Sequence, residues 1–514
     1  MKYRSAPRNG TEQYQSSIKA ESGRGGSTVS LSLNDSQLLK SQAYIGGEWA
    51  PAGNGGTFAV NNPATGESLG TVPDMTAADA RQAIAAAEAA FPEWSAMPAR
   101  KRSQLLRKWF DLIQQHADDL AALLTGEQGK PHAEAKGEVL GGAAYVEWFA
   151  EEAKRIEGDV LSPQTSSQRE VILKQPVGVV GAITPWNFPS SMITRKVSPA
   201  LAAGCPVVIK PAEDTPLSAL ALAELAHRAG IPAGVVNVVT ASHGADVGKE
   251  LSTNPTVRKL SFTGSTAVGK LLMSQASDTV KKVSLELGGN APFLVFDDAD
   301  LDGAVKAATM MKFINTGQTC ICVNRLMVHE NVYDAFMERF TAAVDYLNVG
   351  NGAEKGVTTG PLINDKGLEK VESLVSDAVA KGAKAVRGGK RHDLGGTFYE
   401  PTVLTDVKPE MACFGNEIFG PVAPVYKFSS EDEAVRLAND TPYGLAAYFF
   451  TKDAGRMWRV GEALEYGMVA CNTARFVHEA MPFGGFKESG IGREGSKYGI
   501  EEYLETKFLC MGGL

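Results

Sequence analysis

Two short segments carry side chains suited to covalent chemistry. Cys320 closes the segment Asn315-Thr316-Gly317-Gln318-Thr319-Cys320, where small and amide side chains leave room for close approach to the thiol. Glu286 lies upstream in Leu285-Glu286-Leu287-Gly288-Gly289. A free thiol is mostly protonated at neutral pH, so a nucleophilic cysteine needs a partner base, and a carboxylate beside two glycines can serve as one. The two segments predict a cysteine nucleophile with a glutamate as general base.

Asn187, in the segment Thr184-Pro185-Trp186-Asn187-Phe188-Pro189, completes a pattern that resembles the NAD(P)-dependent aldehyde dehydrogenase superfamily. The resemblance runs from about Tyr44 to the C-terminus. It implies that Cys320 attacks the aldehyde carbon to give a thiohemiacetal. The amide of Asn187 and the backbone N–H of Cys320 then stabilise the oxyanion, and Glu286 activates the water that hydrolyses the thioester. Taken singly, the three residues have ordinary interpretations as a buried thiol, a turn amide and a surface carboxylate.

The resemblance also implies a set of cofactor contacts. Gly264 and Ser265 end a predicted strand and open a helix, whose first N–H groups favour pyrophosphate oxygens. Lys210 and Glu213 would hold the adenosine ribose hydroxyls. Since a carboxylate repels a 2′-phosphate, we expect NAD to be preferred, with NADP possible. The other implied contacts are Trp186, Leu287, Glu417 and Phe419.

A second glycine-rich segment, Gly490-Ile491-Gly492-Arg493-Glu494-Gly495, matches the dinucleotide pattern G-x-G-x-x-G. That pattern indicates a cofactor site only between a strand and a helix, with an acidic residue about twenty positions later. Neither condition is met here, so we expect this segment to be structural.

Three segments resemble succinate-semialdehyde dehydrogenases in particular: Met192-Ile193-Thr194-Arg195-Lys196, Gly317-Gln318-Thr319-Cys320-Ile321-Cys322 and Gly492-Arg493-Glu494-Gly495-Ser496-Lys497-Tyr498-Gly499. In those enzymes arginines and a serine grip the substrate carboxylate, and Arg195 matches one arginine. Ile314 stands where a second arginine is usual, and Ala474-Arg475-Phe476-Val477-His478 replaces the serine-bearing segment. We therefore expect a rebuilt anion site containing Arg475 and His478, although Arg475 has the alternative interpretation of a solvated loop charge.

Several alternatives stay open at this point. The substrate is succinate semialdehyde, glutarate semialdehyde or a sulfonate-tailed aldehyde such as sulfolactaldehyde. A non-catalytic structural or binding descendant is a second class, opposed by the presence of all three chemical residues. A CoA-acylating enzyme is opposed by Glu286, which such relatives typically lack. Cys322 is either a packed thiol or, as in some succinate-semialdehyde relatives, a redox partner of Cys320.

Composition excludes several other classes of function. The chain has 514 residues, 44% hydrophobic and 21% charged, with a net charge of -8. There is no basic stripe for nucleic acid and no apolar run long enough for a membrane span. The six cysteines lack disulfide or zinc spacing and no signal peptide precedes them, so we expect no metal and a reducing, cytoplasmic location.

The elements that position these residues are predicted from periodicity. Helical patterns fill residues 77–160, for example from Arg100 to Leu124. From Val177 short β-rich runs such as Val207–Ile209 alternate with helices, which is typical of a parallel sheet covered on both faces. A second α/β series follows Leu287, with a predicted strand at Val422–Phe428. The predicted fold is α/β and aldehyde dehydrogenase-like, with a Rossmann-type cofactor domain, a second α/β catalytic domain and a small β element that joins subunits into a homo-dimer or tetramer. The predicted divisions are a disordered extension (1–40), the NAD-binding domain (41–160 and 177–286), the catalytic domain (287–480) and oligomerisation strands (161–176 and 498–514).

Overall fold

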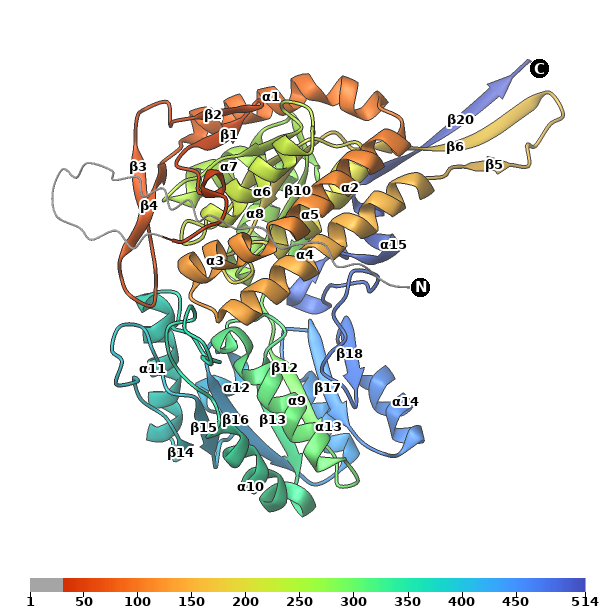
Figure 1. The fold of residues 1–514 in the computed structure, drawn as a ribbon. Helices are drawn as coiled ribbons and strands as arrows, with labels where there is room; N and C mark the ends of the chain where they lie inside the picture. Colours follow the sequence, from red (N-terminus) through yellow and green to blue (C-terminus); the bar gives the residue numbers. More distant parts are fainter. Residues whose placement is uncertain (1–30, 514) are drawn as a thin grey trace, which may run out of the picture.

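The computed structural model describes residues 31–513 and contains two large sheets (Figure 1). The strands of the first sheet are β1 (Ala43–Ile45), β2 (Glu48–Ala50), β7 (Val179–Ile183), β8 (Val207–Lys210), β9 (Val236–Val238), β10 (Val257–Thr263), β11 (Lys282–Glu286) and β19 (Gly490–Ile491). Their order is β19-β11-β10-β7-β8-β9-β1-β2. The run from β11 to β9 is parallel, while β1, β2 and β19 pair antiparallel.

Helices cover both faces of the first sheet. They are α1 (Ala77–Ala96), α2 (Ala99–Gln115), α3 (Ala117–Gln128), α4 (His132–Glu152), α5 (Ser191–Ala203), α6 (Leu217–Arg228), α7 (Gly244–Thr253) and α8 (Thr266–Ala276). Alternate residues of β7 point to opposite faces. Val180 and Ala182 join a core with α2 to α6, and Val179 and Ile183 join a separate core with α1, α7 and α8. The apolar run of this strand is therefore explained by burial on both sides.

The second sheet occupies the other half of the molecule (Figure 1). Its strands are β12 (Ala291–Val295), β13 (Val323–His329), β14 (Lys384–Arg387), β15 (Thr402–Thr405), β16 (Val422–Phe428), β17 (Ala446–Phe450) and β18 (Met468–Cys471). Its helices are α9 (Leu301–Phe313), α10 (Tyr333–Val344), α11 (Asp365–Ala380), α12 (Ala412–Gly415), α13 (Glu431–Asn439) and α14 (Ala454–Ala463). The strand order is β14-β15-β16-β13-β12-β17-β18, and every pair except β14 with β15 is parallel.

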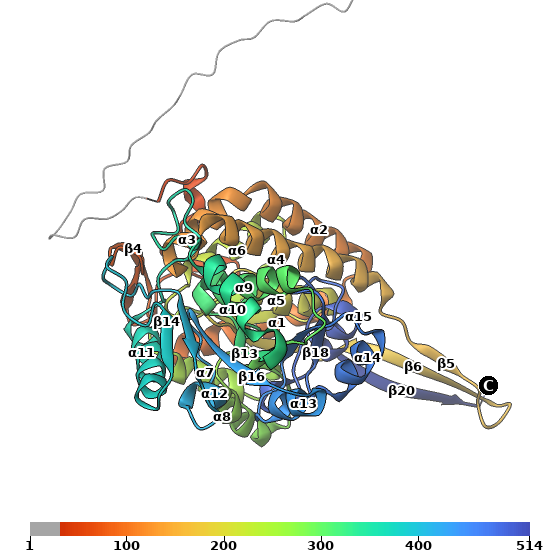
Figure 2. The ribbon, with the colours of Figure 1, turned by 90° about the horizontal axis from the view of Figure 1, so that it is seen from below.

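A narrow three-stranded arm projects from the body, as Figures 1 and 2 show. It consists of β5 (Asp159–Leu161), β6 (Gln168–Pro176) and β20 (Leu504–Gly512), all paired antiparallel. β20 follows the short helix α15 (Ser496–Gly499) and is almost wholly exposed, including the apolar side chains of Phe508 and Leu509. A smaller hairpin, β3 (Thr57–Asn61) with β4 (Ser68–Pro73), lies at the far side of the first sheet.

The prediction that residues 1–40 are disordered is wrong for residues 31–40. Leu38 is fully buried in a 3-10 turn (Ser36–Leu38), and Asp35 forms an ion pair with Arg228 of α6. Leu31 and Leu33 pack against the same core as Leu38. These leucines are spaced among polar residues, so the average composition of the segment is polar and gave no sign that the leucines are buried. Residues 1–30 lie outside the described part of the chain.

Within residues 31–513, none of the helices combines the length and the apolar character needed to cross a bilayer.

Candidate active site

Cys320 follows an unusual turn between α9 and β13. Asn315 and Thr316 have φ values of 49° and 59°, and Gly317 has a φ of 76°. A Cβ atom at Gly317 would overlap the carbonyl oxygen of Gly420, so only glycine fits there. Non-glycine residues in the left-handed region are strained and persist where surrounding contacts hold them. The small and amide residues before Cys320 are therefore explained by the turn that presents it.

Two segments from the first sheet meet this turn. Asn187, between β7 and α5, is buried, and its Nδ2 donates to the carbonyl oxygen of Gln318 at 3.0 Å. Gly289, after β11, lies so close that a Cβ atom there would overlap the carbonyl oxygen of Cys320. The structure thus brings the segments of Asn187, Glu286 and Cys320 together.

Glu286 ends β11, where it pairs with Thr263 of β10 on one side and Gly490 of β19 on the other. Its side chain is buried, and its Oε2 has no hydrogen-bond partner among the described residues. Burial, followed by the charge of Glu494, raises the pKa of Glu286 well above its usual range. A carboxyl with a raised pKa that has no fixed partner is suited to proton transfer.

The thiol of Cys320 is protonated at neutral pH in this structure. Burial, followed by the charge of Glu417, raises its pKa to about 12, and Arg195 opposes that shift. Glu286 also contributes to the raised pKa of Cys320. The charge of Glu286 therefore disfavours the thiolate form of Cys320, and ionisation of the thiol requires a proton acceptor.

Cys320 lines a cavity of 550 Å³ together with Arg195, Arg475 and His478. Ile314 and the whole loop 474–478 also line it, so both positions that depart from the succinate-semialdehyde pattern face the cavity. The apolar part of the remaining wall includes Met310, Met311, Ile321 and Phe483, and Glu138 and Glu479 also line the cavity. The sequence-predicted nucleophile and the three predicted substrate residues therefore share one chamber.

Arg195 projects from α5 and is 4% exposed. Its Nη2 donates to the hydroxyl of Tyr145 at 3.0 Å, and its guanidinium lies over the ring of Phe483 at 4.2 Å. Its Nε has no acceptor, and no carboxylate pairs with it among the described residues. Burying a cation without an anion is costly, so this guanidinium is suited to an anionic ligand. Arg475 and His478, by contrast, are exposed at the mouth.

The predicted cofactor residues lie at the carboxyl ends of parallel strands, where open α/β sheets bind their ligands. Lys210, at the end of β8, is buried and donates from Nζ to Glu213 at 3.0 Å. Gly264 follows β10, and Ser265 caps the N-terminus of α8. The first N–H groups of α8 can take an anionic group, which fits a pyrophosphate.

The other predicted cofactor residues come from segments in both halves of the molecule. The rings of Trp186 and Phe419 meet edge to face with centroids 5.4 Å apart. Oε1 of Glu417 accepts from the N–H of Gly289 at 2.8 Å, and burial raises the pKa of Glu417 to about 7. Leu287 packs against α8, since a Cβ atom at Gly269 would overlap its side chain.

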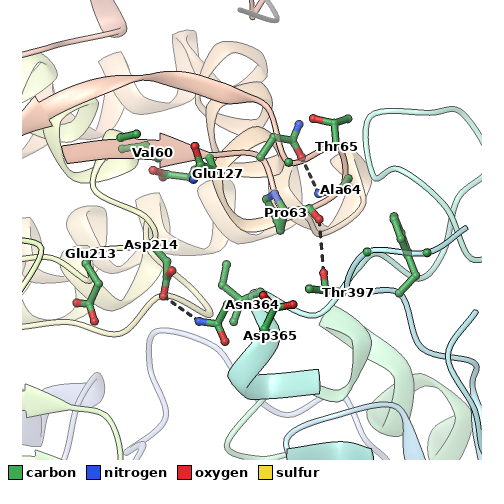
Figure 3. A pocket seen from close by; sticks show the side chains of 18 of the residues that line it. Val60, Pro63, Ala64, Thr65, Glu127, Glu213, Asp214, Asn364, Asp365 and Thr397 are labelled. Atoms are coloured by element: carbon green, nitrogen blue, oxygen red, sulfur yellow. Dashed lines mark hydrogen bonds between the residues drawn. The ribbon is translucent and has the colours of Figure 1, made fainter. Parts of the chain in front are cut away.

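A second cavity, of 690 Å³, lies beside Glu213 (Figure 3). Figure 3 shows Asp214 directed toward Asn364, whose Nδ2 donates to Asp214 Oδ2 at 3.4 Å. The side chains of Glu127 and Asp365 add further carboxylates to the wall. Burial raises the pKa of Glu127 to about 8, so this group does not add a full negative charge at neutral pH. Glu213, Asp214 and Asp365 keep the wall acidic, which disfavours the tail of an anionic substrate here.

Three buried residues near the site were not singled out from the sequence. They are Tyr145, which binds Arg195, and the ion pair of Lys196 with Glu494 beside Glu286. Lys196 and Glu494 do fall within segments quoted for the family resemblance, which is the signal that could have found them. Cys322 is buried, and its possible redox role stays a prediction.

Comparison with known proteins decides the family. The profile of the aldehyde dehydrogenase family matches residues 49–509. The chain belongs to this family. It is 59% identical to a glutarate-semialdehyde dehydrogenase from Pseudomonas aeruginosa, covering 94% of this chain and 100% of the relative. It is 58% identical to the NADP-dependent succinate-semialdehyde dehydrogenase GabD of Escherichia coli, with coverage of 94% and 100%.

The chain is also similar to an enzyme named for a sulfonated aldehyde and to a solved structure. A 3-sulfolactaldehyde dehydrogenase from Pseudomonas putida is 57% identical, with 94% of this chain and 99% of the relative covered. The crystal structure of a succinate-semialdehyde dehydrogenase from Burkholderia pseudomallei superposes with a TM-score of 0.93 at 59% identity, covering 94% of this chain and all of that one. The predicted family and the aldehyde dehydrogenase fold are confirmed. This aldehyde dehydrogenase is therefore an oxidoreductase that uses NAD(P).

Proposed function

We propose that this aldehyde dehydrogenase oxidises a small aldehyde with an anionic tail to the carboxylic acid. The observation that carries the proposal is Arg195, a buried guanidinium that has a free Nε donor and shares a chamber with Cys320. The relatives described above are named for glutarate semialdehyde, succinate semialdehyde and 3-sulfolactaldehyde. Each of these aldehydes carries an anionic group, a carboxylate or a sulfonate, at the end away from the aldehyde. The loss of an arginine at Ile314 and the gain of Arg475 favour a tail different from that of succinate semialdehyde.

The proposed reaction uses three residues of this chain. Cys320 passes its proton to solvent water in the chamber and adds to the aldehyde carbon. The resulting oxyanion is held by the amide of Asn187 and the backbone N–H of Cys320. A nicotinamide cofactor, which Lys210, Ser265 and Glu417 would help to hold, would supply the hydride acceptor that allows this adduct to become a thioester. Glu286 then removes a proton from water, which attacks the thioester carbon, releases the acid and returns the thiol.

A panel of aldehydes tests the proposed substrate class. We expect kcat/KM for succinate semialdehyde, glutarate semialdehyde or 3-sulfolactaldehyde to exceed that for butanal by at least about 10²-fold, since an uncharged tail leaves the buried guanidinium unpaired. Arg195→Met should remove most of this preference, and Arg475→Ala should raise KM for the preferred anionic aldehyde. The measurement is the initial rate of NADH formation at 340 nm. A wild-type preference for butanal would contradict the proposal.

We also propose that NAD is preferred over NADP. The support is Glu213, whose carboxylate is half-exposed beside Lys210 and would meet a 2′-phosphate. We expect kcat/KM for NAD to exceed that for NADP by about tenfold, and we expect Glu213→Ser to raise kcat/KM for NADP. The E. coli relative is named for NADP, so a preference for NADP in the wild type is the outcome that would overturn this proposal.

We further propose that the arm formed by β5, β6 and β20 joins subunits into a homo-oligomer. Its apolar side chains, such as Phe508 and Leu509, have no covering element within the described chain. Exposed strand edges with apolar side chains favour pairing with a second copy. Light scattering that gives the 54.6 kDa mass of one chain would rule this out.

A further inference from the structure

Lys130 is a completely buried lysine in the connection between α3 and α4, far in sequence from Asn187, Glu286 and Cys320. Its Nζ donates to Oε2 of Glu138 at 2.5 Å and to the backbone carbonyl of Asn187 at 2.8 Å. It also lies over the ring of Phe188 at 3.9 Å. An ammonium group has three donors, and here all three directions have an acceptor or a ring. The position of Nζ is therefore fixed.

The carbonyl that Lys130 holds belongs to the proposed oxyanion donor. Nδ2 of Asn315, in the strained turn before Cys320, donates to the same oxygen at 2.9 Å. The backbone N–H of Asn315 in turn donates to Glu134 of α4 at 2.8 Å. The two loops that carry Asn187 and Cys320 are thus fastened to one another and to α4.

Glu138 connects this arrangement to the start of α5. Its Oε1 accepts from the backbone N–H groups of Ser190 and Ser191 at 2.9 and 3.1 Å, where the side chain of Ser190 makes no capping bond. Arg195 projects from this helix one turn later. Glu138 also lines the reaction cavity, so the ion pair lies next to the chamber that contains Cys320.

The backbone of Lys130 is held from both halves of the molecule. Its N–H donates to Oε1 of Gln128 at 3.0 Å, and the N–H of His132 donates to the carbonyl of Gly352 at 2.9 Å. A Cβ atom at Gly352 would overlap the carbonyl oxygen of Lys130. This close backbone packing means that Lys130 reaches Asn187 from a rigid support.

We propose that Lys130, held in place by Glu138, is a positioning residue that sets the backbone of Asn187 so that its amide meets the oxyanion. This inference rests on the proposed role of Asn187. Displacing a reacting or stabilising group by about 1 Å can cost about 10²-fold in rate. A lysine that serves only the stability of the fold would not act through Asn187.

A double-mutant cycle of Lys130 and Asn187 tests the positioning role of Lys130. Lys130→Met should lower kcat about 10²-fold with a smaller change in KM, because the oxyanion donor is misplaced. In the Asn187→Ala background, Lys130→Met should cause no further loss, since the group through which it acts is already gone. Alkylation of Cys320 by iodoacetamide, which passes through no oxyanion, should keep its wild-type rate. Arg102→Met is the matched control. It removes another buried cation that binds a backbone carbonyl, that of Ala202 at 3.1 Å, and should leave kcat unchanged.

The possible failures are distinguishable. If Asn187→Ala lowers kcat but Lys130→Met does not, or if the losses in the cycle are additive, the positioning role is wrong and the proposed function stands. If Asn187→Ala itself has no effect, the proposed oxyanion site is wrong, and this inference falls with it. Should Lys130→Met fail to fold, Glu138→Gln keeps the shape of the side chain and weakens the ion pair. Its kcat should lie between those of the wild type and Asn187→Ala, and a wild-type value would overturn the inference.

Discussion

Replacing Cys320 with alanine should lower kcat by at least about 10⁴-fold, because it removes the thiol that forms the covalent adduct. Without the sulfur, the aldehyde carbon never becomes the tetrahedral centre from which hydride leaves. Binding of NAD, followed by quenching of tryptophan fluorescence, should be unchanged, since the proposed cofactor residues lie on the strand ends of the first sheet and around Glu417. The measurement is NADH formation at enzyme concentrations high enough to detect slow turnover.

Cys322→Ala is the matched control for this variant. It removes a second buried thiol two positions away and should retain most of the activity. The pH dependence of alkylation gives an independent check on the wild type. Because burial raises the pKa of Cys320 to about 12, the reactive thiolate becomes more abundant as pH rises, and the alkylation rate should increase throughout the neutral range. Substantial aldehyde oxidation by Cys320→Ala would show that the nucleophile lies elsewhere.

Glu286→Gln should separate the two halves of the reaction. Thioester formation continues, while hydrolysis loses its general base and slows by about 10²–10⁴-fold. We therefore expect one equivalent of NADH per active site in a rapid burst, followed by very slow turnover. Stopped-flow absorbance at 340 nm with the preferred aldehyde measures both phases.

Asp298→Asn serves as the control for loss of a carboxylate. Asp298 binds Thr451 and Arg456 in the second half of the molecule, outside the residues that line the reaction cavity. It should give wild-type steady-state turnover. If Glu286→Gln also turned over at the wild-type rate without a burst, Glu286 would not be the base for hydrolysis.

Much of the architecture could be predicted from local sequence. The run Val422–Phe428 was predicted as a strand and is β16, and Val207–Ile209 lies within β8, because unbroken apolar and β-branched runs between turn residues leave few alternatives. The segments around Asn187, Glu286 and Cys320 were found by motif, and the structure places them together. Their chemical roles remain predictions until the variants are measured.

Other features depend on contacts between distant parts of the chain. Helical patterns were predicted across residues 77–160 without their ends, and the structure shows that the stretch from Arg100 to Leu124 is two helices, α2 and α3, with His116 between them. The apolar spacing continues across this break, so the break is set by packing rather than by glycine or proline. The ion pairs of Lys130 with Glu138 and of Lys196 with Glu494 join residues whose proximity no local pattern reveals.

The central claim is an acyl thioester on Cys320 whose hydrolysis depends on Glu286. Its most direct test is mass spectrometry of Glu286→Gln, quenched in acid during the NADH burst with the preferred aldehyde and digested. We expect the peptide containing Cys320 to gain the mass of the acyl group, and hydroxylamine to remove it. NADH formation with that peptide unmodified, or with the acyl group on Cys322 instead, would show that no such thioester forms on Cys320.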